Sequence, residues 1–406
     1  MPELLSPAGN FEKLKSAVLY GADAVYFAGE AFGMRAAADN FDIDELGQAI
    51  QYCHDHNVRA FITVNVMPHE DQYQELREYF TKLAPFAPDA LIIADVGVIE
   101  LAKELIPNAE IHISTQASTM SSAACKAWMK LGAKRVVLAR EVTLDEIRKI
   151  KASIPDELEL EVFIHGSMCV SYSGRCLLSE YYTGRSANDG KCTQPCRWEY
   201  RFAEIAEVKR PDDILTVCET PSGSFTLSSK DMCMIEHIPE LIEAGITSFK
   251  IEGRMKSAYY TAVTTNAYRM AIDSYMSDPE NYHFDPLWLR ELESVSHREY
   301  DTGFFYGAPN TDPKTTHNPG YLREKAYIAV VTGYDSETGI AYLEQRNKMC
   351  VGDTLELITP GKTGRQFELS ELWNENNETI ESAPHPKMKC STRLPFEAKP
   401  GDIIRM

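Results

Sequence analysis

The sequence has no apolar run long enough to span a membrane. No stretch of its 406 residues approaches the roughly 20 consecutive apolar residues that a transmembrane helix needs. The opening residues, M-P-E-L-L-S, also lack the basic start and apolar core of a signal peptide. We therefore expect a cytoplasmic protein without a membrane partner, in which cysteine thiols stay reduced.

Positive charge is scarce, with 41 Lys and Arg against 60 Asp and Glu and a net charge of −19. This balance excludes a protein that coats nucleic acid non-specifically. A specific nucleic-acid substrate needs only a local basic face. Residues 165–201 carry five Lys or Arg against three acids, so the sign of the charge reverses there.

Several catalytic signatures are absent. The sequence has no H-E-x-x-H, no G-x-S-x-G elbow, no Walker A motif and no G-x-G-x-x-G. A zincin protease, an α/β-hydrolase, a P-loop nucleotidase and a dinucleotide-binding fold are therefore unsupported.

Short apolar runs alternate with helical patterns over the first 255 residues or so. Most runs are apolar on both faces, as strands of a covered parallel sheet are. The expected strands are residues 3–5, 24–28, 59–64, 90–94, 110–114, 135–139, 160–164 and 249–251.

Capping residues mark the helices between these strands. Asn10 can cap a helix that ends near residue 20, and Thr143 with Glu146 forms a capping box. Asp231 can cap a helix over residues 232–244. Eight strands each followed by a helix predict a (β/α)8 TIM-like barrel, with a doubly wound open sheet as the lesser alternative.

Barrel enzymes place their active sites at the carboxyl ends of the strands. Every expected strand here is followed by polar residues: Ser6, Tyr26, Asn65, Asp95, Gln116, Arg140 with Glu141, His165, and Glu252 with Arg254. We take Asn65, Asp95, Gln116 and Arg140 as candidate substrate-binding residues, although any loop offers polar side chains.

One connection breaks the regular alternation. Residues 167–230 form an insertion after the seventh strand, far above the usual connection length. The sequence predicts a barrel domain over residues 1–306, a linker rich in Gly, Pro, Asn and Thr over 307–321, and a small β-barrel over 322–406.

Four of the ten cysteines gather around this insertion. They are Cys169, Cys176, Cys192 and Cys196. Thiolates are soft ligands for zinc or iron–sulfur clusters, and the loose spacing of the first pair favours a cluster over a zinc ribbon. The alternative is four buried core cysteines, but loop residues such as Gly174 and Pro195 surround them.

Three further residues are candidates for catalysis. His165 follows the seventh strand, where barrel enzymes present acid–base groups, although a lone histidine is as often structural. Glu252 and Arg254 follow the eighth strand. A guanidinium matches a carboxylate or phosphate, and the alternative for Arg254 is a salt bridge to Glu252 or Glu141.

Five motifs resemble those of the peptidase U32 family, often described as collagenase-like proteases. The motifs are E-V-F-I-H-G-S-M-C-V-S-Y-S-G-R-C, C-T-Q-P-C-R-W-E-Y, S-F-K-I-E-G-R-M-K-S, E-L-L-S-P-A-G-N and A-D-A-V-Y. The resemblance runs over nearly the whole chain, including the C-terminal β-domain of the longer members.

The resemblance implies an activity other than proteolysis. Other members are oxygen-independent hydroxylation factors for a transfer RNA wobble uridine, ribosomal RNA or ubiquinone precursors, and they carry a 4Fe–4S cluster on cysteines. The RNA-acting members depend on prephenate as the implied oxygen source. The chain looks most like the transfer RNA branch, whose product is 5-hydroxyuridine at the wobble position.

Carried onto this chain, the resemblance implies ligand roles for Cys169, Cys176, Cys192 and Cys196, with Cys218 and Cys233 as alternatives for the fourth. Arg254 and Arg140 would bind prephenate. His165 and Glu252 would move protons. The basic insertion, with Arg175 and Arg197, would help to hold the RNA.

Two other functions stay open. One is a metal-dependent peptidase of the U32 type. The other is a non-catalytic binding protein whose insertion is stapled by zinc. The need for a paralogous subunit of the same family is also open.

Overall fold

The computed structural model describes residues 1–34, 39–169, 171–172, 175–188, 190–198, 205–207, 210–215, 218–220, 223–225, 229–307 and 321–406. Between residues 205 and 225, and at residue 197, it describes the backbone alone. Much of the predicted insertion and nearly all of the predicted linker therefore lie outside the described residues.

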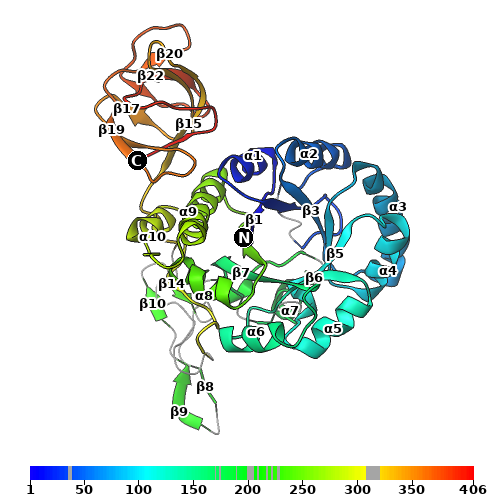
Figure 1. Cartoon of the computed structure of the whole chain (residues 1–406). Helices are drawn as coiled ribbons and strands as arrows, with labels where there is room; N and C mark the ends of the chain where they lie inside the picture. The colour runs from blue at the N-terminus through cyan, green and yellow to red at the C-terminus, as the bar shows by residue number, and fades with distance from the viewer. Residues whose placement is uncertain are drawn as a thin grey trace.

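Eight parallel strands close into a barrel (Figure 1). The eighth strand pairs with both the first and the seventh, and this second pairing closes the ring. The predicted barrel is confirmed, because an open doubly wound sheet has no such closing pair. The strands are β1 (Glu3–Pro7), β2 (Ala24–Phe27), β3 (Arg59–Val64), β4 (Ala90–Ile93), β5 (Glu110–Ile113), β6 (Ala133–Val137), β7 (Glu159–Ser167) and β13 (Ser248–Ile251).

Helices surround this barrel on the outside (Figure 1). Asn10 accepts a hydrogen bond from the Lys13 amide at 3.0 Å, and Thr143 with Glu146 forms a capping box, so both predicted caps are confirmed. The helices are α1 (Phe11–Leu19), α2 (Ile43–Asp55), α3 (Tyr73–Leu83), α4 (Val96–Leu105), α5 (Ser122–Lys130), α6 (Leu144–Lys151), α8 (Ile238–Glu243), α9 (Ala258–Ser277) and α10 (Pro286–Glu293).

The helix predicted over residues 232–244 is wrong at its start. Residues Asp231–Cys233 form a strand, β12, antiparallel to β7, and α8 begins only at Ile238. β7 extends to Ser167, beyond its neighbours in the barrel, and therefore offers an unpaired edge to β12. A further short strand, β14 (Tyr300–Asp301), pairs with β12.

The base of the barrel interior contains a network of buried charges. Arg135 donates to Glu159 at 2.8 Å and to Glu161 at 3.1 Å, and Lys250 Nζ donates to Glu161 at 2.8 Å. An apolar layer that includes Leu5 and Phe61 also lies inside the barrel. Each buried charge has partners of opposite sign, which offsets the cost of removing it from water.

The C-terminal domain is a seven-stranded antiparallel sheet beside α9 and α10 (Figure 1). Its first hairpin, β15 (Tyr327–Asp335) with β16 (Ile340–Gln345), is the predicted one. The other strands of the sheet are β18 (Thr354–Ile358), β19 (Arg365–Glu368), β20 (Trp373–Asn374), β22 (Lys389–Arg393) and β23 (Ile403–Arg405), with a separate pair β17 (Met349–Cys350) and β21 (Ser382–Ala383).

Buried polar contacts join the two domains. Arg405 on β23 donates to Glu291 of α10 at 2.8 Å and to Ser294 at 2.7 Å. Asn266 of α9 donates to the Lys362 carbonyl at 2.9 Å and accepts from the Gly361 amide at 2.7 Å. In the described part of the chain, no helix is both long enough and apolar enough to cross a membrane.

Candidate active site at the barrel mouth

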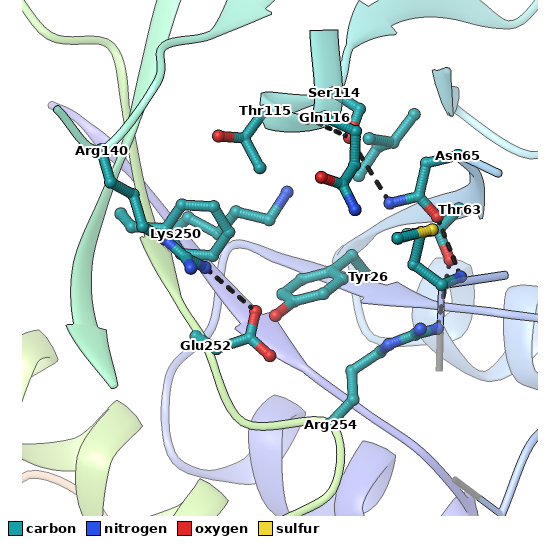
Figure 2. A pocket seen from close by; sticks show the side chains of 13 residues that line it. Tyr26, Thr63, Asn65, Ser114, Thr115, Gln116, Arg140, Lys250, Glu252 and Arg254 are labelled. Carbon is teal, nitrogen blue, oxygen red and sulfur yellow. Dashed lines mark hydrogen bonds and ion pairs between the residues drawn. The ribbon is translucent and has the colours of Figure 1, made fainter. Parts of the chain in front are cut away.

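A cavity lies where the barrel strands end. Its wall comes from strands β2, β3, β4, β7 and β13 and from segments that follow β2, β3, β5, β6 and β13 (Figure 2). The lining residues are Tyr26, Met34, Thr63, Asn65, Ile92, Ser114, Thr115, Gln116, Arg140, Phe163, Lys250, Glu252 and Arg254. This is the face on which barrel enzymes carry their active sites.

Three cations and one carboxylate line the cavity. The Arg140 guanidinium lies 3.9 Å from the Phe163 ring centroid and 3.5 Å from a Glu252 carboxylate oxygen. The buried Arg254 side chain donates to Thr63 Oγ1 at 3.1 Å. The surplus of positive charge suits an anionic small molecule, since a guanidinium fork matches a carboxylate.

The opposite wall is neutral and rich in amides and hydroxyls. Asn65 donates to Ser114 at 3.4 Å and accepts from the Met34 amide at 3.2 Å, which fixes the orientation of its amide. The Gln116 side chain extends toward the space between these residues and Tyr26 (Figure 2). Such groups can hydrogen-bond to the polar edges of a ligand, whereas the cations hold its charge.

Five predicted site residues come together in this cavity: Asn65, Gln116, Arg140, Glu252 and Arg254. Gly166 allows Glu252 to approach β7. Its φ is +105°, and a Cβ atom there would lie 2.5 Å from the Glu252 carbonyl oxygen. Only glycine adopts that backbone conformation without strain and fits that space.

Asp95 does not line the cavity. Its carboxylate accepts from the Val98 amide at 3.1 Å as the N-cap of α4, and it also accepts from Tyr73 Oη at 2.9 Å. An Asp directly before a helix satisfies the free amides of the first turn. The substrate-binding role predicted for Asp95 therefore has no support in its position.

His165 lies outside the cavity as well. The pairing of β7 with β13 shifts by one residue, so that His165 rather than Ile164 lies opposite Ile251. This bulge turns the imidazole toward the helices, where Nδ1 lies 3.3 Å from Tyr268 Oη of α9. Burial lowers the pKa of His165 to about 3, so the ring is neutral at physiological pH.

The sequence prediction missed Lys250, which lines the cavity and bonds to Glu161 below it. Its Nζ also lies 4.4 Å from the Tyr26 ring centroid. A lysine inside the apolar run S-F-K-I was the available signal, because a buried strand rarely carries an unpaired charge.

Two basic residues of the insertion were predicted to contact substrate, and the structure describes the side chain of only one of them. Arg175 is exposed and does not line the cavity. The side chain of Arg197 lies outside the described residues.

The predicted thiol ligands are exposed or half-buried. Cys169 and Cys192 are exposed, and Cys176 and Cys196 are half-buried. By contrast, burial raises the pKa of Cys233 to about 12, which opposes the thiolate form that metals bind. The side chain of Cys218 lies outside the described residues.

The donor set therefore fits a soft metal or cluster in kind and in number. It is not gathered into a site, because the described residues contain no group of three or more His, Cys, Asp or Glu side chains placed to hold a metal ion. The four cysteines remain predicted ligands.

Comparison with known proteins identifies the family. The profile of peptidase family U32 matches residues 9–315, and that of the peptidase family U32 C-terminal domain matches residues 323–405. The chain is 37% identical to tRNA hydroxylation protein P1 of Bacillus subtilis, over 100% of this chain and 94% of that protein.

Two further relatives carry different names. The chain is 37% identical to a 23S rRNA 5-hydroxycytidine synthase of Escherichia coli, over 79% of this chain and 47% of that protein. It is 30% identical to a collagenase of Porphyromonas gingivalis, over 99% of this chain and 97% of that protein. The chain belongs to the peptidase U32 family.

Proposed function

We propose that the chain is an RNA-modifying enzyme that hydroxylates a base without molecular oxygen. The observation that carries the proposal is the full-length similarity to a protein named for tRNA hydroxylation. A relative named as an rRNA 5-hydroxycytidine synthase supports the same reaction class on another RNA. The finer proposal is 5-hydroxyuridine formation at the wobble position of transfer RNA, with prephenate as co-substrate.

The cavity suits the co-substrate part of this proposal. Prephenate carries two carboxylates, and Arg140, Lys250 and Arg254 all line the cavity, although Lys250 also bonds to Glu161 below it and Arg140 lies near Glu252. We assign carboxylate binding to Arg140 and Arg254. Both are buried or nearly so, so each would interact with an anion at low effective dielectric, where charge pairs are stronger than in water.

Glu252 is the candidate for proton transfer, since no histidine or cysteine belongs to the described lining of the cavity. Arg140 lies 3.5 Å from Glu252 and forms an ion pair with that carboxylate. A bound ligand that takes Arg140 as its partner would weaken this pairing. The amides of Asn65 and Gln116 would orient the ring that reacts.

Cys169, Cys176, Cys192 and Cys196 would hold the 4Fe–4S cluster. When bound, such a cluster supplies one-electron redox chemistry. A zinc ion on the same thiols would supply none and would make the insertion structural.

Peptidase activity is the second candidate, because one relative is named a collagenase. Covalent proteolysis requires a nucleophile and a base within hydrogen-bond reach. The described cavity offers the hydroxyls of Ser114 and Thr115 but neither a histidine nor a cysteine beside them. The cavity therefore gives covalent proteolysis no support, and the metal-dependent peptidase predicted from the sequence stays a prediction.

The test is mass spectrometry of transfer RNA nucleosides from a strain that lacks the gene, with and without a plasmid copy. The proposal predicts that 5-hydroxyuridine and its derivatives disappear and that the plasmid restores them. A full complement of hydroxylated wobble uridine in the deletion strain, with no related gene to supply it, would contradict the transfer RNA assignment.

A further inference from the structure

Three exposed aromatic rings lie together on the insertion. Tyr181 is 84% exposed, Tyr182 52% and Trp198 37%. The ring centroids of Tyr181 and Tyr182 are 5.3 Å apart, and those of Tyr182 and Trp198 are 6.3 Å apart. We call these three residues the aromatic surface. Adjacent solvent-facing aromatic rings are costly in water and often mark a binding site.

A hydroxyl network beneath the rings holds them in place. Tyr181 and Tyr182 belong to the short helix α7 (Leu178–Thr183), and Trp198 follows the turn η4 (Pro195–Arg197). Thr193 connects the two elements. Its amide donates to Ser179 Oγ at 3.0 Å, and its carbonyl accepts from Trp198 Nε1 at 3.0 Å. The indole N–H is thus satisfied from below, which leaves the exposed part of the ring to apolar or stacking contacts.

Exposed cations outnumber exposed acids along the segment that carries the aromatic surface. Arg175, Arg185 and Lys191 are exposed on the same segment, where Glu180 is the one exposed acid among the described residues 175–198. This local sign is opposite to that of the chain, whose net charge is −19. The segment therefore carries both exposed aromatic rings and exposed cations in an otherwise acidic molecule.

The segment is packed against the rim of the candidate active site. Gly190 has a φ of +77°, and a Cβ atom there would lie 2.6 Å from the Gly33 carbonyl oxygen and 3.1 Å from Met34 Cα. Met34 lines the cavity, and its amide donates to Asn65. The segment that carries the aromatic surface therefore touches the barrel mouth at Gly190.

We infer that the aromatic surface stacks against unpaired bases of the RNA substrate and holds the strand beside the barrel mouth. The inference rests on the proposed function and adds the recognition surface. Aromatic rings with nearby cations are the common design for single-stranded nucleic acid, because the rings take the bases and the cations take the phosphates. A base that is to react inside a barrel must leave the stack of RNA bases. An aromatic ring of the protein can then stack against the adjacent RNA bases, which have lost that contact.

A protein partner is the other occupant to consider. The core of a protein interface is depleted in charged residues, whereas the segment that carries the rings also carries three exposed cations. Charge complementarity therefore favours a polyanion with aromatic groups, which is RNA.

The test measures binding of the purified full-length chain to two fluorescent RNAs by anisotropy. One RNA is a stem-loop with an unpaired loop, and the other is a blunt duplex with the sequence of the same stem. The variants are Tyr181→Leu and Trp198→Leu, which keep an apolar side chain and remove the ring. Tyr181→Phe keeps the ring, and Tyr342→Leu removes a 49% exposed ring from the C-terminal domain as a matched control.

We expect each ring-removing variant to weaken stem-loop binding about tenfold, the usual cost of losing one stacked base. Duplex binding should stay unchanged, as should stem-loop binding by Tyr181→Phe and Tyr342→Leu. Circular dichroism and the thermal midpoint check that the variants are folded; a largely exposed Tyr181 should be replaceable without loss of stability.

The outcomes separate the inference from the proposed function. If the unaltered chain binds the stem-loop and both leucine variants bind it equally well, the surface has another partner and the inference is wrong while the proposed function stands. An equal loss on duplex and stem-loop would also overturn base stacking. If the unaltered chain binds neither RNA, both the inference and the proposed function fail.

Discussion

Glu161 is a fully buried carboxylate whose charge depends on its neighbours. Burial by itself acts to raise the pKa of Glu161, but the charges of Lys250 and Arg135 outweigh it and lower that pKa from the ordinary 4.5 to about 2. Between these two values the unfolded chain binds more protons than the folded one. The stabilisation is therefore present above about pH 4.5 and is lost as the pH falls toward 2.

Replacing Glu161 by Gln should make the fold less stable and less sensitive to acid. Removing one partner of a buried ion pair costs on the order of 3–5 kcal/mol, because the remaining cations stay buried. Urea unfolding at pH 7 and at pH 3 measures both effects. Glu104→Gln, at an exposed carboxylate that pairs with Arg77, is the control for an ion pair at the surface. Equal pH dependence in the unaltered chain and in Glu161→Gln would refute this account of the barrel interior.

His165 is a residue of a type common in catalysis, but its buried position outside the cavity predicts a structural role. Removing the side chain of a general base lowers the reaction rate roughly 10²–10⁴-fold. Because His165 is buried beneath α9 and bonds to Tyr268, we expect His165→Phe to lower the thermal midpoint and to reduce hydroxylation by less than about tenfold. A thousandfold loss of hydroxylation in a variant with an unchanged thermal midpoint would indicate that His165 takes part in catalysis.

At the scale of single elements, β7 accounts for much of the difference between prediction and structure. Its apolar sequence predicts a strand and its place in the barrel. The bulge that turns His165 outward depends on its pairing with β13, and the pairing of Asp231–Cys233 depends on the exposed edge of β7. Both are contacts between distant segments, which local periodicity does not encode.

The residues that line the cavity were partly predictable from their positions after the strands. Polar residues that follow strands converge in any closed barrel, so Asn65, Gln116, Arg140, Glu252 and Arg254 could be named from their positions. Asp95 also follows its strand, but it is used as a helix cap. The role of Lys250 depends on which face of β13 points inward, and this is fixed only when the barrel closes.

The two candidates for the fourth ligand of the predicted cluster, Cys196 and Cys233, differ in burial. Cys196 is half-buried on η4, whereas Cys233 is buried on β12 with its sulfur 3.8 Å from Tyr268 Oη. We expect Cys196→Ala to lose most of the iron bound after purification without oxygen and Cys233→Ala to keep it. Iron and acid-labile sulfide per chain are the readout.

The control for that experiment is Cys53→Ala, at a buried core cysteine of α2. Loss of iron in Cys233→Ala but not in Cys196→Ala would reverse the assignment. Stoichiometric zinc without iron in the unaltered chain would instead support a structural metal.

For the whole molecule, the distribution of charge matters more than its sum. The net charge of −19 repels a polyanion, while the cavity and the insertion both concentrate cations. RNA binding should then be confined to the barrel mouth and should weaken steeply with salt. The C-terminal domain is joined to α9 and α10 through Arg405 and Asn266, so it forms a fixed wall beside the barrel.

We propose that this barrel mouth hydroxylates transfer RNA and that Arg140 holds the anionic co-substrate there. The most direct test restores the gene to the deletion strain as the unaltered sequence, as Arg140→Met, or as Arg148→Met, and quantifies 5-hydroxyuridine and its derivatives in transfer RNA. Arg148 is exposed on α6, paired with Asp145, and serves as the matched control.

We expect full restoration by the unaltered chain and by Arg148→Met. Arg140→Met should restore at most about a hundredth as much, because it loses a charged contact to the ligand in a largely buried site. Equal restoration by Arg140→Met at the same protein level would contradict the claim that chemistry takes place at the barrel mouth.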